Sequence, residues 1–209
     1  MYKLPYFTEP DHQKVLQFMQ AYPFITLIGY DGMKNVATQV PVLIEKKEDG
    51  QLLLRGHVMR KTDHCTALEQ NKDVLVLFQG PSCYVSPSWY TEKIGGTFNY
   101  ETVHARGTAR MFSDAETIQL LTDLTAHFEA PQENPLYTDQ LAPDYMPMNV
   151  KAIAGFEVII TDIYPIFKLS QNRDDESYIN IVKHLRAGSD TQAHKIADEM
   201  ASRRTHLFA

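Results

Sequence analysis

The sequence has little cysteine, no long apolar run and no excess of positive charge. Its 209 residues include two cysteines. They form no Cys-x-x-Cys pair, so a disulfide framework is excluded and a reducing cytoplasm is expected. No apolar run reaches the roughly 18 residues that span a bilayer, and Met1–Pro5 does not begin a secretory signal. We therefore expect no membrane partner. A formal net charge of −6 argues against a surface devoted to duplex DNA.

Several common catalytic motifs are also missing. The chain has no GxGxxG after a strand, no GxxxxGK[ST], no GxSxG and no HExxH, which removes the usual dinucleotide, nucleoside-triphosphate, serine-hydrolase and zinc-protease sites. His57, His64 and Cys65 lack zinc-ligand spacing and a carboxylate partner. We therefore predict no metal site.

Hydropathy patterning predicts a sheet with helices at its flanks. Three short β-type runs, Phe24–Tyr30, Asn35–Lys46 and Gln51–Val58, are joined by tight turns and predict an antiparallel meander. Further extended segments follow downstream, the last as a strand pair or one long bent strand. They are Asp73–Gln79, ended by Gly80-Pro81, then Cys83–Ser86, Phe98–Phe112 and Ile153–Leu169.

Helix signals lie between and after these strands. A helix capped by Thr8 ends near Pro23, Lys61–Asn71 is compatible with a helix, and Ser113 opens a capping box. A proline-rich connection follows from Pro131 to Pro147, and the last helices are expected at 174–188 and 190–203. The prediction is a mainly β fold with flanking helices (α+β), a mostly antiparallel barrel over 1–173 and a helical extension, 174–209, packed on it.

Three polar segments are candidate sites. In Gly56–Lys61, a glycine lets a ligand approach the backbone, and Arg60 and Lys61 supply two cations for a phosphate. A solvated basic corner is the alternative. Gln79–Tyr90 holds the single tryptophan in a turn-rich loop, which indicates stacking on a planar ring, a dimer contact or ordinary packing. Thr97–Gly107 alternates polar residues along one barrel wall or along a half-exposed strand.

Four tracts, Gly56–Arg60, Phe78–Tyr90, Thr97–Gly107 and Lys168–Arg173, closely resemble the PaiB-type FMN-binding proteins, often described as negative transcriptional regulators. The resemblance implies an FMN-binding split β-barrel related to pyridoxamine-phosphate oxidase and flavin reductase-like proteins. It also implies a homodimer with the flavin in the groove between subunits.

By position in that fold, Thr38–Pro41 would border the isoalloxazine, and Arg60 and Lys61 would hold the phosphate. The resemblance and the polar segments together give one set of predicted cofactor-binding residues, with no catalytic residue assigned. The set is Thr38, Gln39, Val40, Pro41, Gly56, His57, Arg60, Lys61, Trp89, Tyr90, Thr97, Asn99, Tyr100 and His104.

The chain departs from the family pattern at two places. An Asn-Pro pair followed by tryptophan is replaced by Thr62-Asp63 and Cys65, and a second tryptophan is replaced by Phe98. Two fewer indoles leave less stacking surface. The departures predict weaker FMN binding than in relatives, or a different planar ligand.

Three functions remain open from the sequence, and whether the chain is an enzyme is one of the open points. The resemblance implies a negative regulator, with DNA as a partner of the C-terminal helices. From Lys168 onward the charge is only +1, a weak phosphate footprint. The alternative is an FMN-dependent oxidoreductase of the flavin reductase or pyridoxamine-phosphate oxidase type, with Tyr90, Asn99 and His104 facing a substrate. Haem binding through His57 or His104 is the third.

Overall fold

A computed structural model describes residues 4–208. Residues 1–3, on which part of the signal-peptide expectation rests, lie outside this range. The chain divides into two compact units. We call residues 19–78 and 104–163 the sheet unit, and residues 1–18, 79–103 and 164–209 the helical unit. Each is described by itself.

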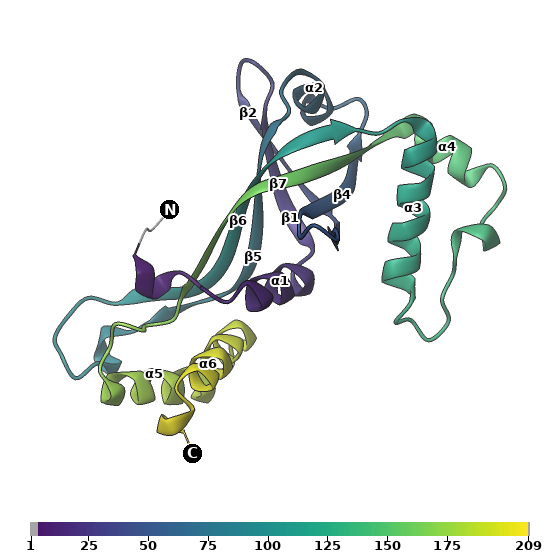
Figure 1. The fold of residues 1–209 in the computed structure, drawn as a ribbon. Helices are drawn as coiled ribbons and strands as arrows, with labels where there is room; N and C mark the ends of the chain where they lie inside the picture. Colours follow the sequence, from purple (N-terminus) through teal and green to yellow (C-terminus); the bar gives the residue numbers. More distant parts are fainter. Residues whose placement is uncertain (1–3, 209) are drawn as a thin grey trace. The chain divides into compact units, whose positions relative to one another are not determined.

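Within the described residues, the strands form one seven-stranded sheet in the order β2-β1-β5-β6-β7-β4-β3 (Figure 1). All seven contribute residues to the sheet unit. Along the chain, β5 and β7 continue into the helical unit, and β6 begins in it. The strands are β1 (Phe24–Tyr30), β2 (Asn35–Pro41), β3 (Leu43–Lys46), β4 (Leu52–Met59), β5 (Asp73–Val85), β6 (Thr97–Met111) and β7 (Ile153–Lys168). The predicted antiparallel, mainly β fold with flanking helices is confirmed.

The predicted three-stranded meander is wrong. The run Asn35–Lys46 splits into β2 and β3, and these strands lie at opposite ends of the strand order. The split falls at Val42, whose backbone N–H donates to the carbonyl of Pro23 at 3.0 Å. The two hairpins, β1–β2 and β3–β4, are antiparallel as expected. Because β2 also contacts β4, the sheet curls back on itself, as a barrel requires.

The two faces of the sheet follow the period of two along each strand. On β1, Ile25, Leu27 and Gly29 are buried, and α2 (Asp63–Gln70) contacts this strand. The alternate residues point to the other face, where Ile28 lies between Ala37 of β2 and Leu75 of β5. The sheet unit therefore has one face in the core and one outward face.

The strand expected to end at Gly80-Pro81 continues to Val85 as β5. A Cβ on Gly80 would lie 2.5 Å from the ring of Phe18, so the missing side chain makes room for a phenylalanine. Pro81 lies beyond Leu75–Leu77, the part of β5 that pairs with β1. Its missing N–H therefore costs no bond to that strand. Neither residue stops the strand here.

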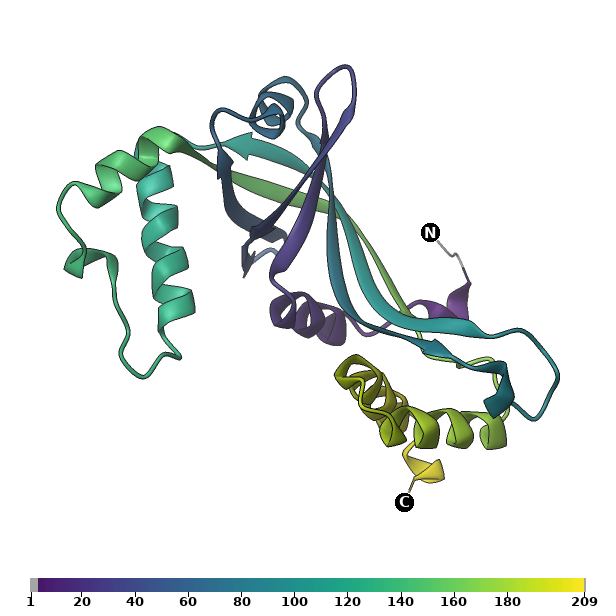
Figure 2. The same cartoon turned by 180° about the vertical axis from the view of Figure 1, so that it is seen from behind.

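The helices of the sheet unit are α2, α3 (Asp114–Glu129) and α4 (Tyr145–Ala152), of which α3 and α4 contact each other (Figure 2). Thr62 caps α2, since its side chain accepts from the backbone N–H of Cys65. Ser113 and Glu116 form the predicted capping box on α3. The helix α4 was not predicted, because it falls partly in the proline-rich connection.

The helical unit contains α5 (Asp175–Ala187), α6 (Thr191–Arg203) and most of α1 (His12–Ala21). The predicted helix pair is confirmed, and its apolar stripes, including Tyr178 and Met200, are buried. The first cap is a correction: Asp11, not Thr8, accepts from the N–H groups of Gln13 (2.8 Å) and Lys14 (3.3 Å). Thr8 instead bridges to Ile166. The boundary at 173/174 stays a prediction.

Candidate functional site

A cavity of about 440 Å³ in the sheet unit lies where β4 ends. We call it the lysine cavity. Two ammonium groups line it and none of its lining residues is acidic. Two methionines on its wall are strongly exposed, Met59 at 55% and Met148 at 58%. The lining residues are Met59, Lys61, Thr62, Met148, Lys151 and Ala152.

Arg60 holds one wall of the lysine cavity in place. Its Nη2 donates to Asp114 Oδ1 at 2.6 Å, and its Nε donates to the carbonyl oxygen of Val150 at 3.1 Å. The backbone N–H of Arg60 donates to Ala152 at 2.9 Å. These bonds fix the C-terminal turn of α4 beside β4, which brings Lys151 to the cavity. Arg60 therefore positions the site, and Lys61 is the predicted cation that lines it.

The predicted segment Thr38–Pro41 divides between the two faces of β2. Val40 is buried in the core and Thr38 points the same way, while Gln39 and Pro41 alternate to the outward face. The Thr38 hydroxyl is 2.8 Å from Nδ1 of His64 on α2. Burial lowers the pKa of His64. The strand period therefore sends the four side chains to two different faces of β2.

Gly56 and His57 have different environments on β4. A Cβ on Gly56 would lie 3.0 to 3.1 Å from Phe156, Pro41 and Val42, so close packing explains this glycine without a ligand. Nδ1 of His57 is buried and has no hydrogen-bond partner among residues 4–208. Burial also lowers the pKa of His57. An orphaned ring nitrogen is costly in a closed core and fits a bound polar group.

Five of the predicted residues lie in the helical unit. The indole of Trp89 stacks on the imidazole of His184, with ring centroids 5.0 Å apart and planes at 10°. The Arg173 guanidinium lies over the Tyr90 ring, 4.8 Å from its centroid. Thr97 accepts a hydrogen bond from Lys168. Asn99 is fully buried, and Tyr100 is half-buried on β6.

The predicted set is shared between the units. Nine of its members belong to the sheet unit, including His104, whose pKa burial lowers. Lys151 and Met148 of the lysine cavity were missed, because α4 was not predicted. The sequence of this segment gives only a weak indication of a binding site, namely a lysine and two methionines near Pro147.

The lysine cavity fits the group that the resemblance implies. Its volume falls within the roughly 300–1,000 Å³ that is common for small-molecule sites. Lys61 and Lys151 match the two negative charges of a phosphate monoester. Met59 and Met148 offer polarizable, adaptable surface for a flat ring. The observed residues are therefore compatible with FMN.

No helix within residues 4–208 is both long and apolar enough to cross a membrane. In the same residues, His, Cys, Asp and Glu form no group of three or more that could hold a metal. Cys65 and Cys83 are buried, free thiols, and burial raises the pKa of Cys83 to about 12.

Known proteins resemble this chain in sequence and in fold. The Bacillus subtilis protein named protease synthase and sporulation protein PAI 2 is 33% identical over 200 residues, covering 96% of each chain. The flavocytochrome Anf3 from Azotobacter vinelandii has a TM-score of 0.62 at 14% identity, covering 80% of this chain and 72% of that one. An FAD- and haem-binding protein from Mycobacterium smegmatis has a TM-score of 0.59 at 15% identity, covering 78% and 73%. At such identities these two similarities show the fold alone.

The motif resemblance is confirmed by the relative from B. subtilis and by a family model that matches residues 1–162. The predicted flavin cofactor agrees with that family's description. The chain belongs to the family described as "Putative FMN-binding domain".

Proposed function

We propose that this chain is an FMN-binding regulatory protein that works as a homodimer and holds the flavin in the lysine cavity. The observation that carries the proposal is the pairing of Lys61 and Lys151 with two exposed methionines in one cavity without acidic residues. The lysines would bind the terminal phosphate and the methionines would contact the ring. FMN would supply redox-active isoalloxazine chemistry there.

The outward face of the sheet supports the dimer. It carries a groove of about 760 Å³ lined by apolar groups such as Ile28 and Leu75. The same groove contains Arg106 together with Asp73 and Asp162, so it carries both signs of charge. A two-fold dimer joins a patch to its own copy, which demands such self-complementarity. We therefore assign this face to a second copy of the chain.

The regulatory part of the proposal rests on the relative whose name refers to protease synthesis and sporulation. The helix pair gives little support to direct DNA reading. Arg186 pairs with Asp198 at 2.9 Å, and Arg204 pairs with Asp175 at 2.9 Å. Paired arginines are poor phosphate ligands. We infer that α5 and α6 stabilise the fold. A gel shift that shows a sequence preference abolished by Lys183→Met and Lys195→Met would contradict this inference.

A flavin-dependent oxidoreductase is the second candidate. It is favoured by the buried Nδ1 of His57, which has no hydrogen-bond partner among residues 4–208, because a neutral imidazole can exchange a proton with a substrate. Anaerobic mixing with a reduced nicotinamide tests this function. Rapid bleaching of the bound flavin favours the enzyme, and a stable spectrum favours the regulator. Haem binding would use His57 or His104 and is distinguished by a Soret band.

We expect Lys61→Met and Lys151→Met each to weaken FMN binding about tenfold or more, since each removes a charged hydrogen bond to phosphate. Riboflavin, which has no phosphate, should bind both variants as it binds the wild type. Titration of flavin fluorescence measures both ligands. Lys47→Met changes an exposed lysine in a turn of the same unit and is the matched control. Equal losses for FMN and riboflavin would contradict the assignment of the phosphate.

A further inference from the structure

A second cationic cavity lies in the helical unit, where β7 ends. Its volume is about 200 Å³, and we call it the β7 pocket. It is built around the Lys168–Arg173 tract, which the motif resemblance singled out and which the proposed function does not use. The rings of Tyr6 and Phe7 form one wall. The polar lining residues are Thr97, Lys168, Ser170, Asn172 and Arg173.

The β7 pocket concentrates positive charge. None of its lining residues is acidic. Arg173 makes no ion pair with an acid anywhere in residues 4–208, and its guanidinium lies over the Tyr90 ring. Lys168 donates to Thr97, and both burial and the nearby Arg173 lower the pKa of this lysine. Two partly buried cations repel each other, and an anion between them removes that repulsion.

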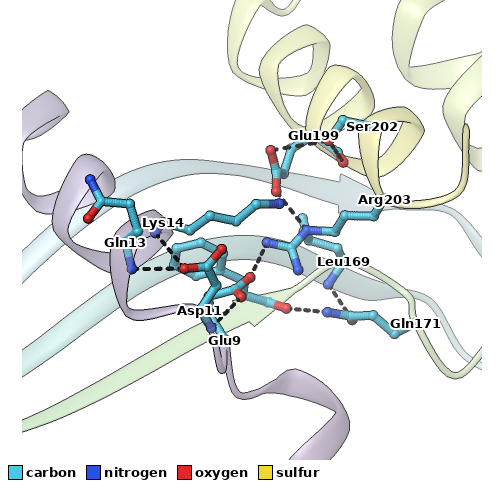
Figure 3. Close-up of polar contacts among 10 residues, drawn as sticks. Glu9, Asp11, Gln13, Lys14, Leu169, Gln171, Glu199, Ser202 and Arg203 are labelled. Atoms are coloured by element: carbon cyan, nitrogen blue, oxygen red, sulfur yellow. Dashed lines mark hydrogen bonds and ion pairs between the residues drawn. The ribbon is translucent and has the colours of Figure 1, made fainter.

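The loop that carries these groups is held rigid. Gln171 closes it from inside: its Nε2 donates to the carbonyl of Phe167, and its Oε1 accepts from the N–H of Leu169 at 2.8 Å (Figure 3). Arg204 binds it from the C-terminal side, donating to the carbonyl oxygens of Gln171 at 2.8 Å and Arg173 at 3.3 Å. A loop fixed in this way loses little conformational entropy when it binds a ligand.

Ser170 shows that the backbone itself is constrained here. Its φ is 60°, in the left-handed region that non-glycine residues seldom adopt, and its side chain is buried. Its hydroxyl donates to Oδ1 of fully buried Asn99 at 3.0 Å, and Asn99 Nδ2 contacts Met200 Sδ at 3.4 Å. Strain maintained by such packing is typical of ligand sites.

We propose that the β7 pocket binds the phosphate group of a small molecule other than the flavin. A guanidinium, an ammonium and neighbouring hydroxyl and amide groups together match the charge and the several acceptor oxygens of a phosphate dianion. A cavity of about 200 Å³ is smaller than most drug-sized sites, so it suits a headgroup with a short attached chain. This site does not depend on flavin binding and would make the protein responsive to a phosphorylated metabolite.

Inorganic phosphate is the probe for this site. Isothermal titration of the full-length protein, at constant ionic strength and against chloride, should show saturable binding. We expect Arg173→Met to weaken it about tenfold or more, and Arg173→Lys to retain part of the affinity. Asn172→Asp places a negative charge on an exposed lining residue without changing packing and should abolish binding. Lys93→Met, at an exposed loop residue of the same unit, is the control.

Two results overturn the proposal: wild-type protein that binds phosphate no better than chloride, or Asn172→Asp protein that binds phosphate as tightly as the wild type. Titrations that include flavin distinguish a separate phosphorylated metabolite from the phosphate group of FMN. Phosphate that binds equally with and without saturating FMN supports a separate metabolite. Weaker FMN binding with unchanged riboflavin binding in Arg173→Met would support the phosphate site but place the flavin phosphate there, which contradicts the role of Lys61. If the protein binds no flavin, the phosphate titration by itself still tests whether the β7 pocket binds phosphate.

Discussion

Gly107→Ala is expected to lower the free energy of unfolding by about 3 kcal/mol, at the upper end of typical overpacking costs. A Cβ at this position of β6 would lie 2.4 Å from the carbonyl oxygen of Ile159 and 2.6 Å from Cγ1 of Val158. The first contact is with the backbone of β7, which cannot move aside without breaking the sheet. Urea unfolding followed by circular dichroism measures the loss.

Gly95→Ala is the matched control for that substitution. A Cβ there meets nothing within 4 Å, so the change should stay within about 0.5 kcal/mol of the wild type. Similar unfolding midpoints for Gly107→Ala and Gly95→Ala would show that β6 and β7 do not approach as closely as described.

Glu101→Gln is expected to stabilise the protein at high pH and not at low pH. Glu101 is 7% exposed on β6. Burial, followed by the carboxylates of Glu199 and Glu9, raises its pKa to about 7, against the lowering effect of Arg203 and Lys14. Figure 3 shows the side chains of Glu9, Lys14, Glu199 and Arg203, with Arg203 donating to Glu9 at 2.5 Å and to Glu199 at 2.6 Å. The cluster therefore contains three carboxyl groups, counting Glu101 itself, and only two cationic side chains.

The direction of the pH effect follows from the raised pKa. The folded state holds the Glu101 proton more tightly than the unfolded state, whose pKa is near 4.5. Stability from this group is complete below about pH 4.5 and is lost as pH rises through about 7. The loss amounts to about 3 kcal/mol, because each pKa unit corresponds to about 1.4 kcal/mol.

Urea unfolding at pH 5 and pH 8 measures this effect as a difference between Glu101→Gln and the wild type. The variant should gain most of that stability relative to the wild type at pH 8 and little at pH 5. Glu176→Gln, at an exposed acid on α5, should show no such change. A stability difference that is the same at both pH values would rule out the titration of Glu101 in this range.

Local signals in the sequence predicted the elements of this fold better than their arrangement. The capping box at Ser113 and the apolar stripes of α5 and α6 depend on residues three or four apart, so the chain alone displays them. The order that places β2 and β3 at opposite ends of the sheet depends on long-range pairing. The hydrogen bond from Val42 to Pro23 that marks the break between these strands is visible in the structure and not in the sequence of Asn35–Lys46.

The same limit applies to the site. The resemblance implied Arg60 and Lys61 as the phosphate ligands, and the structure places Lys61 on the wall of the lysine cavity. In the structure Arg60 bonds to Asp114 and to the end of α4, and Lys151 is the second ammonium group that lines the cavity. Lys151 is distant in sequence and lies in an unpredicted helix. A three-dimensional arrangement was needed to identify it.

The most direct test of flavin binding is to release and identify the small molecule carried by freshly purified protein. Absorption spectroscopy followed by mass spectrometry of the denatured sample is sufficient. We expect FMN, at close to one molecule per chain after loading with excess FMN. Protein that carries haem, or that remains free of flavin after loading, would contradict it.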